Sequence, residues 1–431
     1  MSAFKEHPLR DVLANELHTR AADEITAPAQ ISQFAVLTGE DNNRAIEHLA
    51  ELCARMGASA PTTGANHFTT DLGGLVVRFE RHTEFCSYAF VRRGRTGDMP
   101  FERPPLTAVP DDWLATLPGE VLAGVHIVLE AQDEPEHSPE ELSLRHFSGN
   151  VLIAAAVGGG AAKAYSDLRL DADRFIRFLV RDVNLLPSHA GRTVQRLIEM
   201  NTYRALALLA LPQAREASPV LREIDLALAD IAQRMADPTN LEKDADLLRE
   251  LSSLTARVEA IATTNSYRFA ASRAYYQLVV RRLEDLRQGR LGERLTFSAF
   301  MDRRLTPAMT TCKSVADRTE ALSTRGSRVV SLLRTRVEVD LQAQNQRLLE
   351  SMDHRARLQL RLQQAVEGLS VVAIGYYMVG LVGYLAKGLK GAGVLEVSDT
   401  VVTGLAVPVV LLVVYLGLKR AKKAMGLEEG E

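Results

Sequence analysis

The sequence lacks most of the residue patterns that mark catalytic, metal-binding and secreted proteins. It contains three cysteines, Cys53, Cys86 and Cys312, which stand far apart and form no CxxC pair. This spacing excludes a zinc knuckle and a disulfide framework, and a few scattered thiols fit a reducing compartment. Residues 1–20 carry charges of both signs and no apolar run, which is not the pattern of a secretory signal.

The sequence also lacks a large excess of charge of either sign. The formal net charge is only −3, so no global field would attract nucleic acid, and we expect no nucleic-acid partner. Lysine accounts for nine of the 51 basic residues. Five of those nine lysines flank two apolar runs near the C-terminal end: Lys387, Lys390, Lys419, Lys422 and Lys423.

The two apolar runs, residues 369–386 and 401–418, contain no charged side chain. Each has 18 residues, which in a helix is just enough to cross the hydrocarbon core of a bilayer. Membrane helices tolerate internal residues such as Pro408, and the short connection allows only an antiparallel turn. The sequence therefore predicts a transmembrane hairpin over 366–418, with the lipid bilayer as a partner. The alternative is a buried hairpin in a soluble core.

Basic residues predict the orientation of this hairpin. Arg355, Arg357 and Arg361 precede the first run, and four basic residues follow the second, at the start of a tail (419–431) that then turns acidic. The connecting loop holds only two lysines. By the positive-inside bias, we expect a two-pass protein with both termini in the cytoplasm.

A long helix is expected before the membrane. Residues 296–365 contain no helix breaker except Pro307 and Gly326, so we expect a stalk helix that continues into the first run. A candidate oligomer seam recurs at helical spacing and comprises Val337, Leu341, Asn345, Leu348 and Met352. A seam asparagine can fix register and oligomer state, so we expect a homo-oligomer; a solvated asparagine beside an imperfect stripe is the alternative.

The segment 186–295 is expected to form a helical bundle before the stalk. A first amphipathic helix ends at Pro212, a second runs over 219–235, and a third runs over 241–287. Their apolar residues keep three- and four-residue steps, which is typical of helices that fold back on one another.

Residues 1–185 predict an α+β domain, so the fold class is an α+β domain followed by a long-helix bundle and stalk and a two-helix transmembrane hairpin, mostly α. Strands are expected over 31–38, 72–81, 85–92 and 121–131. Gly158-Gly159-Gly160 is expected to be the turn of a hairpin, and residues 100–118 a proline-rich loop. Helices are expected over 7–20, 41–56 and 171–181.

No residue pattern in this domain predicts catalysis. The run Gly158 to Lys163 lacks the GxxxxGK[ST] spacing of a phosphate loop, and no HExxH motif occurs. An acidic stretch over 130–141 could gather divalent cations, but a solvated loop is the more common meaning of such a run. Four histidines, His67, His82, His126 and His146, would form a site only if the fold brought them together. We expect no enzyme and no cofactor.

Several long segments resemble one bacterial family. They are FKEHPLRDVLANELHTR, GRTVQRLIEMNTYRALALLALP, SYRFAASRAYYQLVVRRLEDLR, FMDRRLTPAMTTCKSVADR and LLESMDHRARLQLRLQQAVEGLSVVAIGYYMVGLVGYL. The family comprises uncharacterised, membrane-anchored proteins with a domain of unknown function. The resemblance covers nearly the whole chain and implies a protein of the bacterial inner membrane, but it supplies no activity and no site residues.

The architecture also resembles CorA-type magnesium transporters, which are homopentamers. Those proteins join an α/β domain by a very long helix to a first span that lines the pore, and a second span with a basic tail follows. Their hallmark Gly-Met-Asn motif is absent, because the matching position reads Leu385-Ala386-Lys387-Gly388. A ring of Lys387 would repel hydrated Mg²⁺.

Two functions therefore stay open. The first is CorA-like ion transport of unknown selectivity, with Tyr376 and Tyr377 in the first span and Lys387 and Lys390 at its mouth as the candidate conduit residues. The second is a membrane-tethered cytoplasmic sensor or scaffold without transport. A hydrolase or nucleotide enzyme in the first domain is a third, weaker hypothesis.

Overall fold

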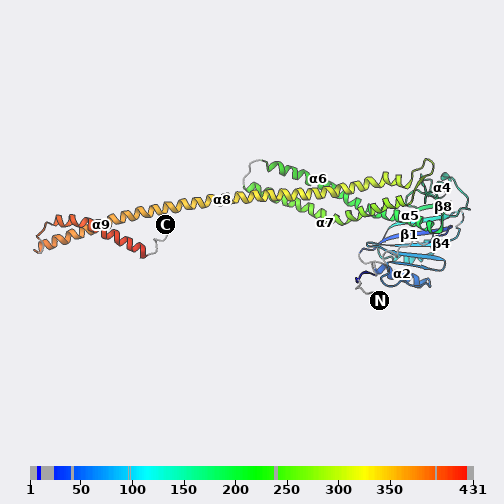
Figure 1. The fold of residues 1–431 in the computed structure, drawn as a ribbon, viewed down its shortest axis with the longest axis horizontal. Coiled ribbons are helices and arrows are strands. Elements are labelled where there is room, and N and C mark those ends of the chain that lie inside the picture. Colours follow the sequence, from blue (N-terminus) through cyan, green and yellow to red (C-terminus); the bar gives the residue numbers. More distant parts are fainter. Residues whose placement is uncertain are drawn as a thin grey trace. The chain divides into compact units, whose positions relative to one another are not determined.

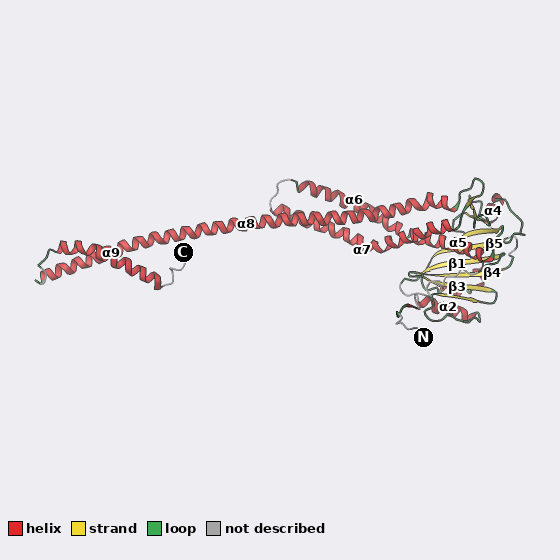
Figure 2. Cartoon of the chain, in the orientation of Figure 1, coloured by secondary structure: helices red, strands yellow, loops and turns green. Residues whose placement is uncertain are grey.

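The computed structural model describes residues 7–10, 24–39, 43–95, 97, 99–236, 241–393 and 396–424. The chain forms two compact units. We call Met1–Pro238 with Asp246–Val330 the sheet unit, and Thr239–Ala245 with Ser331–Glu431 the C-terminal unit. Figure 1 colours the chain along its sequence, and Figure 2 separates its helices from its strands.

A mixed sheet forms the centre of the sheet unit. The described residues give nine strands: β1 (Ala29–Leu37), β2 (His67–Asp71), β3 (Leu75–Arg81), β4 (Phe85–Arg93), β5 (Glu120–Glu130), β6 (Ile153–Val157), β7 (Ala162–Ser166), β8 (Ile176–Asp182) and β9 (Gly289–Arg290). Their order is β2-β3-β4-β1-β5-β8-β7-β6-β9. All neighbours are antiparallel except β5 and β8.

The strands predicted over 31–38, 72–81, 85–92 and 121–131 are confirmed as β1, β3, β4 and β5. The glycines at 158–160 join β6 to β7 as predicted, and all three have positive φ, which glycine adopts at little cost. The edge strands β2 and β9 were not predicted. Of the helix predicted over 7–20, residues 11–20 lie outside the described part of the chain.

The helix predicted to begin at Asp171 and reach Arg181 is wrong, because strand β8 occupies most of that stretch. The Asp171 carboxylate accepts hydrogen bonds from the backbone N–H groups of Asp173 and Phe175, at 2.9 and 3.0 Å. An aspartate that satisfies backbone donors in this way caps a turn as readily as a helix. The apolar residues of Ile176–Asp182 then pack in the centre of the sheet.

One face of the sheet is covered by helix α2 (Asn43–Arg55), which confirms the helix predicted over 41–56. Apolar residues of α2 pack with alternate residues of β1, β3 and β4 around Trp113, which is fully buried. The Trp113 indole N–H donates to the His48 carbonyl at 2.7 Å, and its ring stacks on the His48 ring. This apolar cluster fixes one half of the sheet to α2.

Short helices occupy the segments that were expected to be loops. The proline-rich segment contains a 3-10 helix (η1, Pro105–Ala108) and α3 (Asp111–Ala115), and it carries Trp113 into the core. Part of the acidic stretch forms α4 (Pro139–His146), with a capping box in which Ser138 and Glu141 exchange hydrogen bonds. The prediction of a solvated loop over 130–141 is therefore wrong at both ends, since Glu130 also ends β5.

Helix α5 (Pro187–Leu208) lies against the opposite face of the sheet. Helices α6 (Ala210–Arg234), α7 (Leu241–Asp285) and the first part of α8 (Phe297–Gly391) extend the helical part into a bundle (Figure 2). The predicted end of one helix at Pro212 and the predicted start of the next at Pro219 are wrong. Pro212 lies in the first turn of α6, where the missing N–H costs nothing, and Pro219 lies inside α6.

Ion pairs and apolar stripes join the helices of the sheet unit. Asp225 of α6 accepts from Arg318 and Arg325 of α8, each at 3.2 Å. Arg257 of α7 pairs with Glu223 of α6 at 3.0 Å. Buried residues repeat at three- and four-residue steps: Leu221, Ile224, Leu228 and Ile231 in α6, and Leu247, Leu251, Leu254 and Val258 in α7.

The C-terminal unit contains the rest of α8 and the final helix α9 (Asp399–Ala424). The stalk helix predicted over 296–365 and on into the first apolar run is confirmed, because α8 runs from Phe297 to Gly391 without a break. In this unit, the first turn of α7 also contacts α8. Arg336 pairs there with the fully buried Asp244 at 2.9 Å.

Candidate functional site

The two apolar runs form an antiparallel pair of helices at the end of the C-terminal unit. Gly375 lies so close to α9 that an added Cβ atom would be 3.0 Å from Leu411, and at Gly383 the same atom would be 3.3 Å from Thr403. The position in α9 falls by eight as the position in α8 rises by eight, which is the register of an antiparallel hairpin. Small residues allow such close approach between membrane helices.

Both helices of this pair are long and apolar enough to cross a membrane. Most of their large apolar side chains are exposed in the single chain: Leu369, Val372, Leu381 and Leu385 in α8, and Leu405, Val409, Leu412 and Val413 in α9. An apolar surface of this extent does not stay in contact with water. We call this surface the apolar hairpin.

The candidate conduit residues lie on the first helix of the apolar hairpin. Tyr376 and Tyr377 are 78% and 74% exposed, so α9 covers neither ring. Their ring centroids are 6.0 Å apart. Lys387 and Lys390 lie in the last turns of α8 and are exposed. Each residue is thus available to lipid, water or a second copy of the chain.

The candidate oligomer seam is an exposed stripe on α8. Val337 is half-buried, whereas Leu341, Asn345, Leu348 and Met352 are exposed, Met352 to 66%. At 3.6 residues per turn the five positions fall within an arc of about 80° on the helix. The described residues of this chain leave the stripe uncovered from Leu341 to Met352.

Buried charges of the sheet unit form specific ion pairs. Glu84 pairs with Arg268 of α7 at 2.7 Å, and Asp171 pairs with Arg177 at 2.7 Å. The nearly buried Glu130 lies 3.5 Å from Arg181. Burial and the neighbouring Glu134 raise the pKa of Glu130 to about 7, against a smaller opposing effect of the guanidinium.

The four histidines singled out from the sequence do not form a shared site. His126 exchanges a hydrogen bond with Ser32 at 2.9 Å and stacks on Phe175, while His146 lies in α4 against Phe101. Burial lowers the pKa of both to about 4. His82 instead stacks on Phe85, and no group of metal-binding side chains occurs among the described residues.

Sequence reasoning missed two hollows in the sheet unit. One is an open groove of about 1360 Å³ between α4, the β6–β7 hairpin and the loop before α8. Charges of both signs line it, and many already pair, as Lys163 does with Glu136 and Arg294 with Glu140. The other is an open, mostly apolar cavity near the end of α5. Residues far apart in the sequence line both hollows, so no local sequence motif predicts either of them.

An α/β sheet unit, a mostly helical remainder and two helices able to cross a membrane define the class of this protein. The chain belongs to the family described as "Protein of unknown function (DUF3422)", which matches residues 5–425. This confirms the resemblance to a family with a domain of unknown function. A comparison with curated proteins gives no match.

Proposed function

We propose that this protein is a two-pass, self-associating protein of the bacterial inner membrane that acts as a membrane-tethered cytoplasmic sensor or scaffold. The observation that carries the proposal is the apolar hairpin, because its uncharged, exposed side chains need lipid as their solvent. The pairing of Glu84, Asp171 and Glu130 with arginines gives these carboxylates a structural role, which supports binding rather than catalysis.

The proposed orientation rests on the distribution of basic residues. Arginines precede the first span, and the chain after the second span begins with Lys419 and Arg420. Single cysteines placed at Glu396, between the two helices, and at Glu431 test it with a membrane-impermeant thiol reagent. The three native cysteines are buried and should stay silent. In whole cells we expect labelling at Glu396→Cys alone, and labelling at Glu431→Cys alone would invert the topology.

Self-association is proposed through the oligomer seam. A Met352→Cys variant should form a disulfide between copies under mild oxidation, because this side chain lies on the seam. A Glu350→Cys variant is the matched control: it is equally exposed, but it lies about 160–200° around the helix from Met352 and Leu348. Equal cross-linking at both positions would mean random collision and would remove the seam from the proposal.

A second candidate function is ion transport along the first span of an oligomer, as in CorA-type proteins. The observation that favours it is the unbroken course of α8 from Phe297 to Gly391, which a pore-lining stalk requires. Purified protein in liposomes should then show ion flux that changes when Lys387 is replaced by Gln. Absence of flux at every pH and potential tested would leave the sensor or scaffold.

A further inference from the structure

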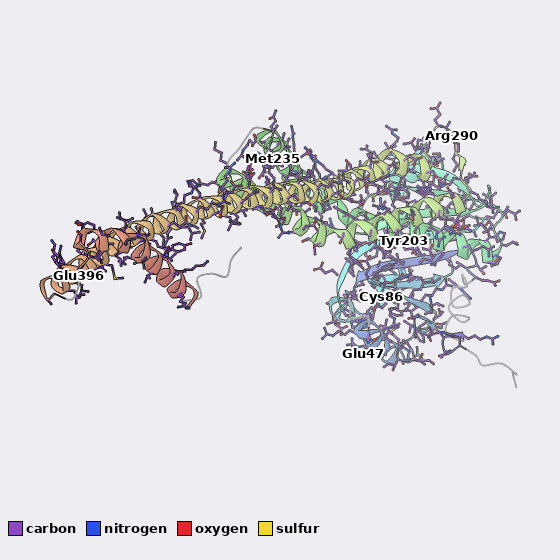
Figure 3. All side chains as sticks on the ribbon, turned by 60° about the vertical axis from the view of Figure 1, so that its left-hand side comes forward. Glu47, Cys86, Tyr203, Met235, Arg290 and Glu396 are labelled. Carbon is purple, nitrogen blue, oxygen red and sulfur yellow. The ribbon has the colours of Figure 1, made fainter. Side chains whose placement is uncertain are left out.

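The apolar cavity near the end of α5 contains an arginine without an acidic partner. Its volume is about 650 Å³, which lies within the range of small-molecule sites. Phe34 of β1, Phe175 before β8 and Leu208 of α5 contribute apolar walls, with Leu106, Leu117 and Leu122. Figure 3 labels Tyr203, the neighbour of this arginine in α5.

The arginine is Arg204, and it lines the cavity. One terminal nitrogen donates to the Asn201 side-chain oxygen at 2.8 Å, and that asparagine is almost completely buried. The Arg204 Nε atom is inaccessible to solvent and has no acceptor within the described part of the chain. Burial alone lowers the Arg204 pKa to about 10, so the guanidinium stays charged at neutral pH.

This arrangement differs from that of three other arginines held inside the sheet unit. Arg181, Arg268 and Arg282 each reach a carboxylate, of Glu130, Glu84 and Glu199 respectively. No carboxylate pairs with Arg204 among the residues that the structure describes. Asp171, an acid of the neighbouring loop, is already engaged by Arg177. A half-buried cation with no paired anion favours a role in binding an anion.

The apolar wall beside Arg204 is held in place by close packing of Phe175 against strand β5. Phe175 lies close to strand β5 at Gly124, where an added Cβ atom would be 2.6 Å from the ring. Phe175 also stacks on His126, two residues further along β5, with ring centroids 4.3 Å apart. Two exposed apolar residues, Val121 and Leu170, also line the cavity and make its edge apolar.

We propose that this cavity binds an amphipathic carboxylate, with the anionic head on Arg204 and Asn201 and the alkyl part between Phe34, Phe175 and Leu208. A guanidinium is a strong N–H donor to a carboxylate, and Arg204 lines the cavity with only one of its terminal nitrogens bonded to Asn201. The exposed Arg174 lines the same cavity and adds a second positive charge. The alkyl part would bury apolar surface that the empty cavity exposes to water.

The test compares octanoate with 1-octanol on the full-length protein in vesicles of zwitterionic lipid. Trp113 is the only tryptophan, and its neighbours Leu114 and Leu117 line the cavity, so its fluorescence reports filling. Octanoate should bind saturably and at least about tenfold more tightly than octanol. Equal binding of the two, or no saturable binding of octanoate, would overturn the proposal without any variant.

Variants then assign the anion to Arg204. Arg204→Gln should weaken octanoate by about tenfold or more and leave octanol unchanged. Ala205→Phe, which fills the cavity from the same helix, should abolish binding of both. Arg192→Gln, an exposed arginine of α5 away from the cavity, is the matched control and should behave as the native protein. Native octanoate affinity in Arg204→Gln would overturn the assignment.

Discussion

Gly375 is predicted to be essential for pairing of the two hairpin helices. A Cβ atom at this position would lie 3.0 Å from Leu411 Cδ2, which is closer than a comfortable carbon–carbon contact. Gly375→Val adds two further carbons and must push the helices apart, and overpacking of this kind costs about 1–3 kcal/mol. Gly380→Val is the matched control, because nothing lies within 4 Å of an added Cβ there.

The control should even favour the helix slightly. Glycine is less favourable than valine in a helix by roughly 0.4 kcal/mol, so Gly380→Val should be neutral or mildly stabilising. The same substitution, made five residues apart in one helix, should therefore differ in effect by about 2 kcal/mol. This corresponds to about a thirtyfold change in the equilibrium between paired and separated helices.

A disulfide reports this equilibrium directly. Gly383 and Thr403 face each other, with a built Cβ atom of Gly383 3.3 Å from Thr403 Oγ1, so a disulfide between cysteines at these positions would report the pairing of the two helices. The oxidised fraction in a glutathione buffer, in detergent, measures their effective concentration. Gly375→Val should lower it about thirtyfold relative to Gly380→Val. An equal change in Gly375→Val and Gly380→Val, or no disulfide in the parent pair, would refute the packing argument.

Three further predictions concern the sheet unit. Burial lowers the pKa of His126 and His146 from 6.5 to about 4, so below pH 6.5 the unfolded chain binds more protons than the folded chain. The free energy of unfolding, measured by urea titration, should therefore fall as the pH drops from 6.5 toward 4. Glu130 should affect stability in the opposite direction, because burial raises its pKa from 4.5 to about 7 and the folded chain binds the extra proton. Its contribution to the free energy of unfolding should fall as the pH rises from 4.5 to 7, and Glu130→Gln should remove this pH dependence. Trp113→Leu should lower stability by about 3 kcal/mol, whereas Leu226→Ala on the exposed surface of α6 should change it by less than about 0.5 kcal/mol; similar melting temperatures for the two would contradict the burial of Trp113.

The sequence predicted elements where a single periodicity dominated. Helix α8 and the strands β1, β3, β4 and β5 follow from apolar spacing and the positions of turns. β8 was missed because Asp171 looks like a helix cap, and the apolar residues after it fit a buried strand or a helix equally well. The parallel partner that decides between them, β5, lies about fifty residues earlier.

The cavity beside Arg204 could not be predicted for a related reason. In the sequence, Arg204 belongs to an amphipathic stretch and reads as an ordinary surface cation. Its unusual character depends on which carboxylates lie near it, and those are set by sheet pairing and by the path of the loop before β8. The helix boundary at Pro212 was ambiguous in a similar way. The same local sequence fits a proline that ends one helix and a proline in the first turn of the next, and the second is what the structure has.

The two exposed apolar surfaces of the C-terminal unit need different solvents, and this distinguishes anchoring from assembly. The seam lies among charged residues such as Arg347, Glu350 and Asp353, which cannot enter a bilayer cheaply, so protein must cover it. The apolar hairpin carries no charge, so lipid alone suffices. Deletion of residues 366–431 should therefore release the protein from the membrane while it still self-associates, as sedimentation would measure. A monomer would place assembly in the spans, where a conduit would need it, and would count against the seam.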